Sequence, residues 1–439
     1  MERLNNSYPW LKLALWALAA TLLFGFLAAI RYQTGAWLDD YLSFRKLRPL
    51  HVSSALGWIF ASAIGLVLYA NRRVVRGSEK AMLPLYVVTG SAILISYVMG
   101  IFGGREYWEF SPWLIPPILM VWLLFGKAVL RRLKFSGTAV PVYRWMWLTG
   151  LLFFAFTFLE SLLWHLPAIH SQPVRETALQ WKSYGSLVGS WNMLIYGSAA
   201  WLGRKLQNKR ESAADSWQEG ALYLLSLTNL MFNWSHHIYD LPVPHWILQL
   251  GFYISMSELL VLYLLLRSFK LSSDKRPAAR LLQYSELWVI INLVPAILMS
   301  VPWLNQYTHG THVTVAHAMG TTIGINTMIL LAGIAWHACW VSDARTTGRL
   351  LALQVLLFLF VASLFATGVY AGLIRQDYTA FQLRQIIQPF LTIAMWLGMG
   401  TAVAFVPIWL QLYRGLNNPT ELNRAKTAVK EVEWNEVVH

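Results

Sequence analysis

The feature that most constrains the fold of this chain is a series of apolar stretches, each long enough to cross a lipid bilayer as a helix. A spanning helix needs about 20 mostly apolar residues. Stretches of this kind recur from end to end, at residues 9–30, 52–71, 82–102, 112–131, 143–164, 184–203, 217–235, 246–267, 284–304, 313–338, 350–373 and 386–412. Backbone polar groups in lipid must be bonded within the protein, which favours helices. The sequence therefore predicts an all-α integral membrane protein with about twelve transmembrane helices.

Composition supports this class and indicates a single domain. Of the 439 residues, 56% are hydrophobic and only 13% are charged, which is too apolar for an ordinary soluble protein. No long polar segment separates the apolar stretches, so residues 1–439 are predicted to form one transmembrane domain. The single cysteine, Cys339, cannot form an internal disulfide. Stability must then come from helix packing and bound cofactors.

The formal charge of +14 is explained by topology and does not indicate nucleic-acid binding. The basic residues cluster in alternate loops and in the C-terminal tail. They are Arg72, Arg73, Arg76, Lys80, Arg131, Arg132, Lys134, Arg204, Lys205, Lys209, Arg210, Lys270, Lys275, Arg276, Arg280, Arg345, Arg349, Arg424, Lys426 and Lys430. By the positive-inside rule these loops and both termini are cytoplasmic. The expected partner of the surface is the bilayer.

Residues 308–319 read Thr-His-Gly-Thr-His-Val-Thr-Val-Ala-His-Ala-Met and open the tenth apolar stretch. Residues two apart on an α-helix point about 200° apart around its axis, so His317 and Met319 face nearly opposite sides. Imidazole and thioether are both axial ligands of heme iron, so this helix could hold one heme on each face. The alternative is that His317 is a hydrogen-bonded packing residue and Met319 fills the core.

His51 lies at the start of the second apolar stretch, at the same predicted membrane depth as His317 and Met319. A His on one helix and a Met on another could complete a six-coordinate low-spin heme between them. Alternatively, the His51 ring could extend to the membrane interface.

The outer loop after the third stretch contains Glu106 and Glu109 in the sequence Gly-Arg-Glu-Tyr-Trp-Glu. Carboxylates three residues apart share a face if the loop is helical, and their oxygens suit Ca²⁺. A solvated turn would have a similar sequence.

Ionisable residues inside spans are candidate functional residues because burying them in lipid is costly. Glu160 and Glu258 meet this description, and His165 and His170 follow Glu160 in a loop.

The adjacent histidines His236 and His237 close the seventh stretch and precede Pro242 and Pro244. If the helix ended between them, both rings could converge on one metal.

Taken together, these residues resemble the heme-copper oxidase superfamily, and most closely the large subunit of bacterial nitric oxide reductase, over nearly the whole chain. The segment from Tyr307 to His317 is similar to that family's Tyr-Thr-His-Gly-Thr-x-x-Thr-x-x-His motif, and Gly-Arg-Glu-Tyr-Trp-Glu is similar to its Gly-Arg-Glu-x-x-Glu loop. The His-His pair stands in the expected place. Glu258, twenty-two residues after His236, falls where the family has a buried Glu.

The resemblance implies two b-type hemes, non-heme iron and calcium. By position, His51 with Met319 would ligate the low-spin heme, and His317 would ligate the high-spin heme. His236 and His237 would hold the non-heme metal, with Glu258 as proton donor or metal ligand. Glu106 would be a calcium ligand.

The implied function is that of a divergent nitric oxide reductase large subunit, an oxidoreductase that converts two NO, two protons and two electrons to N₂O and water in denitrification. Electrons would come from a membrane-anchored cytochrome c subunit or another donor. The implied location is the bacterial cytoplasmic (inner) membrane, with multiple spans.

Two positions depart from the family pattern. Met319 stands where the family has a second low-spin His, and a thioether should raise the heme potential because the softer ligand favours Fe(II). The sixth stretch, 184–203, lacks the family's third metal-binding His and two Glu, and has Gly185, Gly189 and Met193 instead. Gly185, Gly189 and Ser190 indicate close helix packing in this stretch.

The missing third ligand must come from elsewhere in the chain. Two neutral imidazoles favour a carboxylate partner, and Glu258 is the one placed by spacing. Glu160, Asp240 or a loop His could also complete the set.

Other functions remain open on the sequence alone. A two-heme electron-transfer or gas-sensing subunit without the chemistry would carry the same heme ligands. A transporter is less favoured because no internal-repeat or discontinuous-helix signal is evident.

Overall fold

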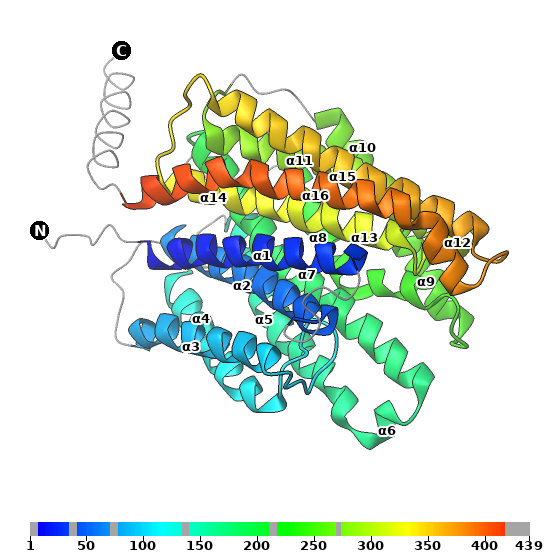
Figure 1. Ribbon diagram of the computed structural model, residues 1–439. Helices are drawn as coiled ribbons and strands as arrows, with labels where there is room; N and C mark the ends of the chain where they lie inside the picture. Colours follow the sequence, from blue (N-terminus) through cyan, green and yellow to red (C-terminus); the bar gives the residue numbers. More distant parts are fainter. Residues whose placement is uncertain are drawn as a thin grey trace, which may run out of the picture.

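The computed structural model describes residues 8–34, 42–70, 78–133, 140–209, 217–268 and 274–417, which form helices joined by turns (Figure 1). The α-helices are α1 (Pro9–Thr34), α2 (Phe44–Ala70), α3 (Ser78–Val98), α4 (Ile115–Arg132), α5 (Val142–Ser161), α6 (Pro167–His170), α7 (Pro173–Leu206), α8 (Trp217–Phe232), α9 (His245–Met256), α10 (Glu258–Ser268), α11 (Pro277–Met299), α12 (Pro302–Thr308), α13 (His312–Met319), α14 (Met328–His337), α15 (Thr346–Ile374) and α16 (Ala380–Asn417). Three short 3₁₀ turns are η1 (Pro112–Leu114), η2 (Leu162–His165) and η3 (Asn233–Ile238), and η4 (Gly320–Thr327) is π-helical.

The helices confirm the predicted membrane architecture. Within the described ranges, ten helices or continuous helix runs are long and apolar enough to cross a bilayer. The two remaining predicted spans, 184–203 and 217–235, coincide with α7 and with α8 plus η3. The prediction of an all-α membrane protein with about twelve spans is therefore correct.

Helix α7 packs against α2, α5, α8, α11 and α14. Its buried serines bond to backbone carbonyls one turn earlier on the same helix. Ser190 Oγ donates to the Leu187 carbonyl at 2.6 Å, and Ser198 Oγ donates to the Leu194 carbonyl at 2.8 Å. Because these hydroxyls are hydrogen-bonded within their own helix, they can be buried in the membrane without leaving an unsatisfied polar group.

The centre of the bundle is formed by α2 and by the continuous run from α13 to α14. In the apolar window of each, 72% of the residues are buried, against 11–44% in the eight other apolar spans. Helix α1 packs against both α2 and α16, and α1 begins at the end of the bundle where α16 finishes (Figure 1). The start of α1 and the end of α16 therefore lie at the same end of the bundle, as an even number of spans requires.

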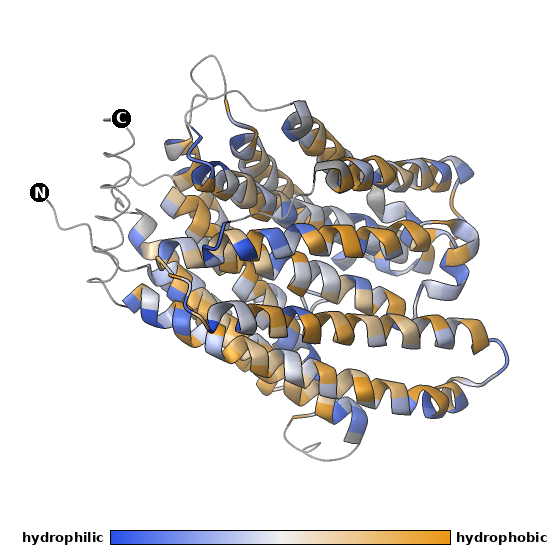
Figure 2. Ribbon diagram, turned by 90° about the horizontal axis from the view of Figure 1, so that it is seen from above, coloured by the Kyte–Doolittle hydropathy of each residue, from blue (hydrophilic) through white to orange (hydrophobic). Residues whose placement is uncertain are grey.

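Figure 2 shows how hydropathy is distributed along the helices. Apolar residues occupy most of their middle parts, and hydrophilic residues gather toward the ends and in the connections. Many of the Lys and Arg residues used for the topology prediction lie outside the described residues. They fall in 71–77, 134–139, 210–216, 269–273 and 418–439. The cytoplasmic assignment of the termini therefore stays a prediction from the sequence.

Helix α15 approaches the backbone of α12 and α13 unusually closely, at two glycines. A side chain at Gly368 would collide with the backbone nitrogen of Val313, and one at Gly372 would collide with the carbonyl oxygen of Tyr307. Only hydrogen fits at these positions. The contact fixes where α13 lies in the bundle.

We expect Gly372→Ala to lower the free energy of unfolding by about 1–3 kcal/mol, because the added methyl group overpacks a backbone contact. The measurement is unfolding of the purified protein in detergent micelles. Gly348→Ala on the same helix is the matched control, since a Cβ there would meet nothing within 4 Å. Equal stability of the two variants would contradict the proposed tight contact.

Candidate functional site

Two local backbone features position the residues at the start of α13. Gly310 has φ +74°, a left-handed conformation that glycine adopts without steric cost. Thr311 caps the helix, since its side chain accepts a hydrogen bond from the Val313 backbone nitrogen at 3.2 Å. The chain thereby ends α12 and begins α13 within a few residues. This turn directs His317 and Met319 into the bundle.

Met319 points toward α15 and α16. It packs beside the buried Leu364 and Ala394, which belong to those two helices. His317 has a different neighbour, because its ring is hydrogen-bonded to the backbone of Asn292 on α11. The two side chains therefore leave α13 in different directions, as their spacing predicts.

His317 has the environment expected of a metal ligand. Its Nδ1 is buried without a hydrogen-bond partner among the described residues. The ring forms a hydrogen bond with the Asn292 backbone, and Nδ1 is the nitrogen left without a partner. Because buried polar atoms are nearly always satisfied, an unsatisfied imidazole nitrogen here fits a residue that binds an external group.

The His51 ring is oriented by contacts with α1. Its Nδ1 lies 2.9 Å from the Thr21 carbonyl oxygen on α1, and a Cβ added to Gly25 would approach the ring to 2.8 Å. An Nδ1–H bonded to a carbonyl leaves Nε2 unprotonated and able to bind iron, which is the usual arrangement behind a metal-binding histidine. His51 contacts α1, and Met319 packs toward α16. Since α1 packs against α16, the two side chains adjoin neighbouring helices.

The His-His pair does not flank a helix end as the sequence suggested. Helix α8 already ends at Phe232, and both histidines belong to the 3₁₀ turn η3. The tighter 3₁₀ winding still keeps the two rings together, with centres 4.1 Å apart.

A third histidine, His309, joins this pair from the turn between α12 and α13. Its ring centre is 5.7 Å from that of His237. Trp181 of α7 stacks on His237 at 4.3 Å with an interplanar angle of 9°, and lies 5.7 Å from His309. His237 and His309, from two segments that are distant in sequence, thus both lie beside Trp181, and His236 adjoins His237.

His309 is expected to be neutral at pH 7. Burial lowers its pKa, the Asp240 carboxylate opposes this effect, and the Arg375 guanidinium acts in the same direction as burial. Neutral imidazole is the form that binds metals.

Glu258 begins α10, where Ser257 separates that helix from α9. It interacts electrostatically with Tyr196 of α7. Across the described ranges, no three His, Cys, Asp or Glu side chains converge closely enough to hold a metal ion. The assignment of Glu258 as third ligand thus stays a prediction.

The loop with Glu106 and Glu109 is not helical, so the expectation of a shared helical face is wrong. Instead, Gly103 and Glu109 close a turn by a backbone hydrogen bond of 3.0 Å. Glu109 is buried and pairs with Arg48 of α2. Glu106 is exposed, and its carboxylate accepts a hydrogen bond from Gln180 at 3.4 Å.

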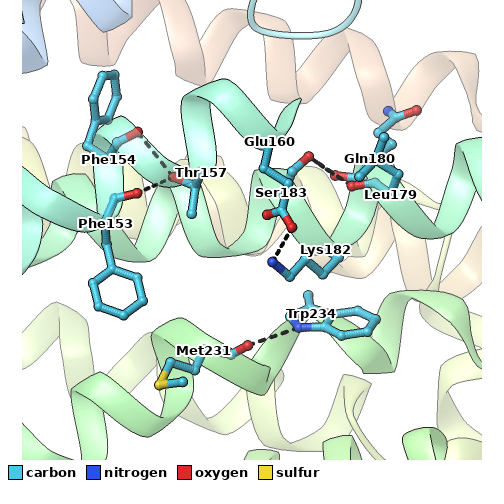
Figure 3. Close-up of polar contacts among 10 residues, drawn as sticks. All are labelled: Phe153, Phe154, Thr157, Glu160, Leu179, Gln180, Lys182, Ser183, Met231 and Trp234. Atoms are coloured by element: carbon cyan, nitrogen blue, oxygen red, sulfur yellow. Dashed lines mark hydrogen bonds and ion pairs between the residues drawn. The ribbon is translucent and has the colours of Figure 1, made fainter. Parts of the chain in front are cut away.

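Glu160, the other ionisable candidate within a span, forms an ion pair with Lys182 of α7 (Figure 3). The side chains are 15% and 30% exposed, so the pair is largely removed from solvent. Lys182 also lies over the ring of Phe156, 5.3 Å from its centre. This pairing accounts for a carboxylate inside a span without metal binding.

The loop histidines interact locally. His170 Nδ1 lies 3.2 Å from the Trp164 carbonyl oxygen, and His165 stacks on the Trp164 ring at 4.3 Å. Both contacts are made within their own loop.

Helix α7 offers no space for the family's third ligand. A Cβ at Gly185 would lie 2.8 Å from Trp234 Cβ, and one at Gly189 would lie 2.9 Å from Leu230 Cα. Met193 is buried in a small apolar cluster with Leu230. The predicted close packing through these glycines is present.

Sequence reasoning missed two residues at this site. His309 stood inside the quoted motif, but nothing in the spacing shows that the turn after α12 brings it to His237. Trp181 carries no sequence signal, because tryptophan is frequent throughout the chain.

Comparison with known proteins identifies relatives along most of the chain. Residues 8–400 match the family model described as cytochrome c and quinol oxidase polypeptide I. A cytochrome c oxidase subunit 1 homolog of Azorhizobium caulinodans is 23% identical over 380 residues, covering 77% of this chain and 67% of that protein. A nitric oxide reductase subunit of Stutzerimonas stutzeri is 21% identical over 359 residues, covering 75% of this chain and 74% of that protein.

The fold is similar to that of a solved heme-copper terminal oxidase dimer studied by cryo-electron microscopy. The TM-score is 0.68 at 13% identity, with 94% of this chain and 84% of the other covered. At this identity the likeness concerns the fold.

We expect Lys182→Met to lower the free energy of unfolding by about 3 kcal/mol, because it leaves the Glu160 carboxylate buried without its counter-charge. The double variant Glu160→Gln with Lys182→Met should recover most of that loss, since no unpaired charge remains. A double-mutant cycle in detergent micelles measures the coupling. Additive losses in the two single variants would show that the ion pair is not stabilising.

Proposed function

Since this chain belongs to the cytochrome c and quinol oxidase polypeptide I family, the heme-copper oxidases, we propose that it is a divergent nitric oxide reductase large subunit. The family assignment establishes a heme-binding oxidoreductase scaffold in a membrane. The choice of NO as substrate is supported by the Tyr-Thr-His-Gly-Thr segment at residues 307–311 and the Gly-Arg-Glu-Tyr-Trp-Glu loop.

The observation that best supports the proposal is the pairing of the His236 and His237 rings, whose centres are 4.1 Å apart, together with the buried ring nitrogen of His317 on α13. A heme ligand facing a pair of metal-binding imidazoles is the arrangement needed to hold two small molecules against each other. When bound, a high-spin heme and a non-heme metal supply electrons and open coordination positions for two NO molecules.

The residues proposed for the low-spin heme are His51 and Met319. The hydrogen bond from His51 Nδ1 to Thr21 orients the ring, and Met319 extends from α13 toward α15 and α16. A low-spin heme held by these two residues would supply electron transfer from the donor toward the second heme. The two hemes are proposed to be b-type.

Glu258 is proposed as the proton donor. Conversion of two NO to N₂O and water consumes two protons, and a carboxyl oxygen of Glu258 can hold and release one of them. Glu258 is partly buried at the start of α10, and a carboxylate in such a position can take up and release a proton.

Glu106 is proposed to bind calcium at the outer end of the bundle. Its exposed carboxylate and the Gln180 side-chain amide present oxygen ligands of the kind Ca²⁺ prefers. The further proposals are a single domain, termini on the cytoplasmic side of a bacterial inner membrane, and a membrane-anchored cytochrome c subunit as donor.

The test is N₂O production by the purified complex supplied with reductant and NO, followed by gas chromatography. Two NO consumed per N₂O formed is the expected stoichiometry. Consumption of O₂ without N₂O formation from NO would identify an oxidase instead.

A second candidate is a two-heme electron-transfer or gas-sensing subunit, and the glycine packing of α7 favours it. Gly185 and Gly189 occupy the helix face from which the family supplies a third metal ligand and two glutamates. Elemental analysis showing two hemes and no further metal per chain would select this function.

We expect Met319→His to retain the low-spin heme and to lower its reduction potential, because the more basic nitrogen stabilises Fe(III). Redox titration monitored by visible absorption measures the change. His312→Ala, on the same short helix, is the control and should leave the potential unaltered. An unchanged potential and spectrum in Met319→His would contradict the pairing with His51.

A further inference from the structure

His317 and the turn that follows it are tied to α11 through a single residue, Asn292. The Asn292 carbonyl oxygen accepts a hydrogen bond from the His317 ring. The Asn292 side chain is buried, and its Nδ2 donates to the Thr321 hydroxyl at 2.7 Å. Thr321 in turn donates from that hydroxyl to the His317 carbonyl at 3.1 Å. These three hydrogen bonds form a closed cycle that holds His317 at both its imidazole and its backbone.

The approach of Asn292 to the start of η4 depends on a glycine. A Cβ added to Gly320 would lie 2.4 Å from Oδ1 and 3.0 Å from Cγ of Asn292. Gly320 is buried and stands directly before Thr321. The absence of a side chain at Gly320 therefore lets the Asn292 amide reach the Thr321 hydroxyl.

Two further hydrogen bonds hold the other end of η4. The Trp58 indole of α2 donates to the Thr327 hydroxyl at 3.2 Å. Asn326 donates from Nδ2 to Asn192 Oδ1 of α7 at 2.9 Å. The end of η4 is thus bonded to α2 and α7 and its start to α11. The contact with α11 is the one that includes His317.

The cycle has a feature that helix packing does not require. An amide inside a membrane bundle is costly to bury, and an apolar side chain could fill the same space. An imidazole that donates one nitrogen to a carbonyl is held in one orientation and keeps a lone pair on its other nitrogen, as a metal-bound histidine does. In His317 that other nitrogen, Nδ1, is buried without a hydrogen-bond partner among the described residues.

We propose that Asn292 and Thr321 are positioning residues for His317 as the ligand of the high-spin heme. The link between the Asn292 side chain and Thr321 fixes α13 against α11, and the Asn292 carbonyl then holds the imidazole. This role rests on the proposed function, which makes His317 a heme ligand. Both residues act through His317 and not on the reacting molecules.

The hydrogen bond to the ring also has an electronic effect. A histidine that donates to a carbonyl is a more basic ligand, and a more basic nitrogen stabilises Fe(III). Breaking the link between Asn292 and Thr321 should loosen the hydrogen bond to the ring while the imidazole stays present. The expected results are a weaker bond between His317 and iron and a higher reduction potential of that heme.

The experiment measures the iron–histidine stretching band of the reduced high-spin heme by resonance Raman spectroscopy on the purified full-length complex. A low-spin heme with two axial ligands gives no such band, so the band reports on His317. Thr321→Val removes the hydroxyl, and Asn292→Leu removes the amide. Both variants should move the band to lower frequency and weaken retention of the high-spin heme by about tenfold.

Two further variants separate this role from a general effect on the helix. Thr321→Ser keeps a hydroxyl at the same place and should keep the band of the wild type. Thr314→Val is the matched control on α13. The Thr314 hydroxyl donates to the Thr311 carbonyl at 2.7 Å, within its own segment, so its removal should leave the band unchanged.

An unchanged band in Thr321→Val would overturn the proposal, whether or not Asn292→Leu assembles, and so would an equal shift in Thr314→Val. Loss of both hemes from Thr321→Val would also contradict it, because the contact would then hold the bundle as a whole. A wild-type complex without the band would show that His317 holds no high-spin heme. N₂O production decides the proposed activity separately, since a complex can show the band and its shift without reducing NO.

Discussion

The close approach of α15 to the α12–α13 segment is the contact on which the arrangement of the site depends. Gly368 and Gly372 bring the α15 backbone against Val313 and Tyr307 without intervening side chains. In lipid, where helix association gains little from the hydrophobic effect, such backbone approach is a main source of packing energy. Because α13 carries two of the three predicted heme ligands, this contact determines where they enter the bundle.

Several polar groups inside the bundle are satisfied by the protein itself. Buried hydroxyls such as those of Ser190 and Ser198 bond to their own helix, and the Glu160 carboxylate has Lys182 as its counter-charge. His237 and His317 are among the side chains that have a buried polar atom with no hydrogen-bond partner in the described segments, which is Nδ1 in each ring. The free-energy cost of burying these unbonded ring nitrogens would be offset if both rings bind external groups.

The π-helical turn η4 lies directly after Met319 and separates the ligand-bearing part of the central helix from α14. Its glycines face neighbouring side chains closely, with Gly320 against Asn292 and Gly324 against Trp288. A π turn inserts one extra residue into the helix and rotates the residues that follow it about the helix axis. The side chains of α14 are therefore rotated relative to those of α13. Such turns are frequent at functional sites, and none of this irregularity is visible as a pattern of residue types.

The sequence by itself determined the class of protein and the position of its spans, because apolar length and backbone bonding in lipid leave few alternatives. It also predicted that His317 and Met319 face different ways, since helical geometry alone decides the angle between them. It could not place Glu109, whose buried pairing with Arg48 comes from a non-helical turn. Nor could it show that His309 adjoins His237, because that proximity depends on Asn305 and Arg375 holding two turns that are distant in sequence. Local periodicity specifies which residues share a helix face, whereas the meeting of separate turns is decided only when the helices have packed.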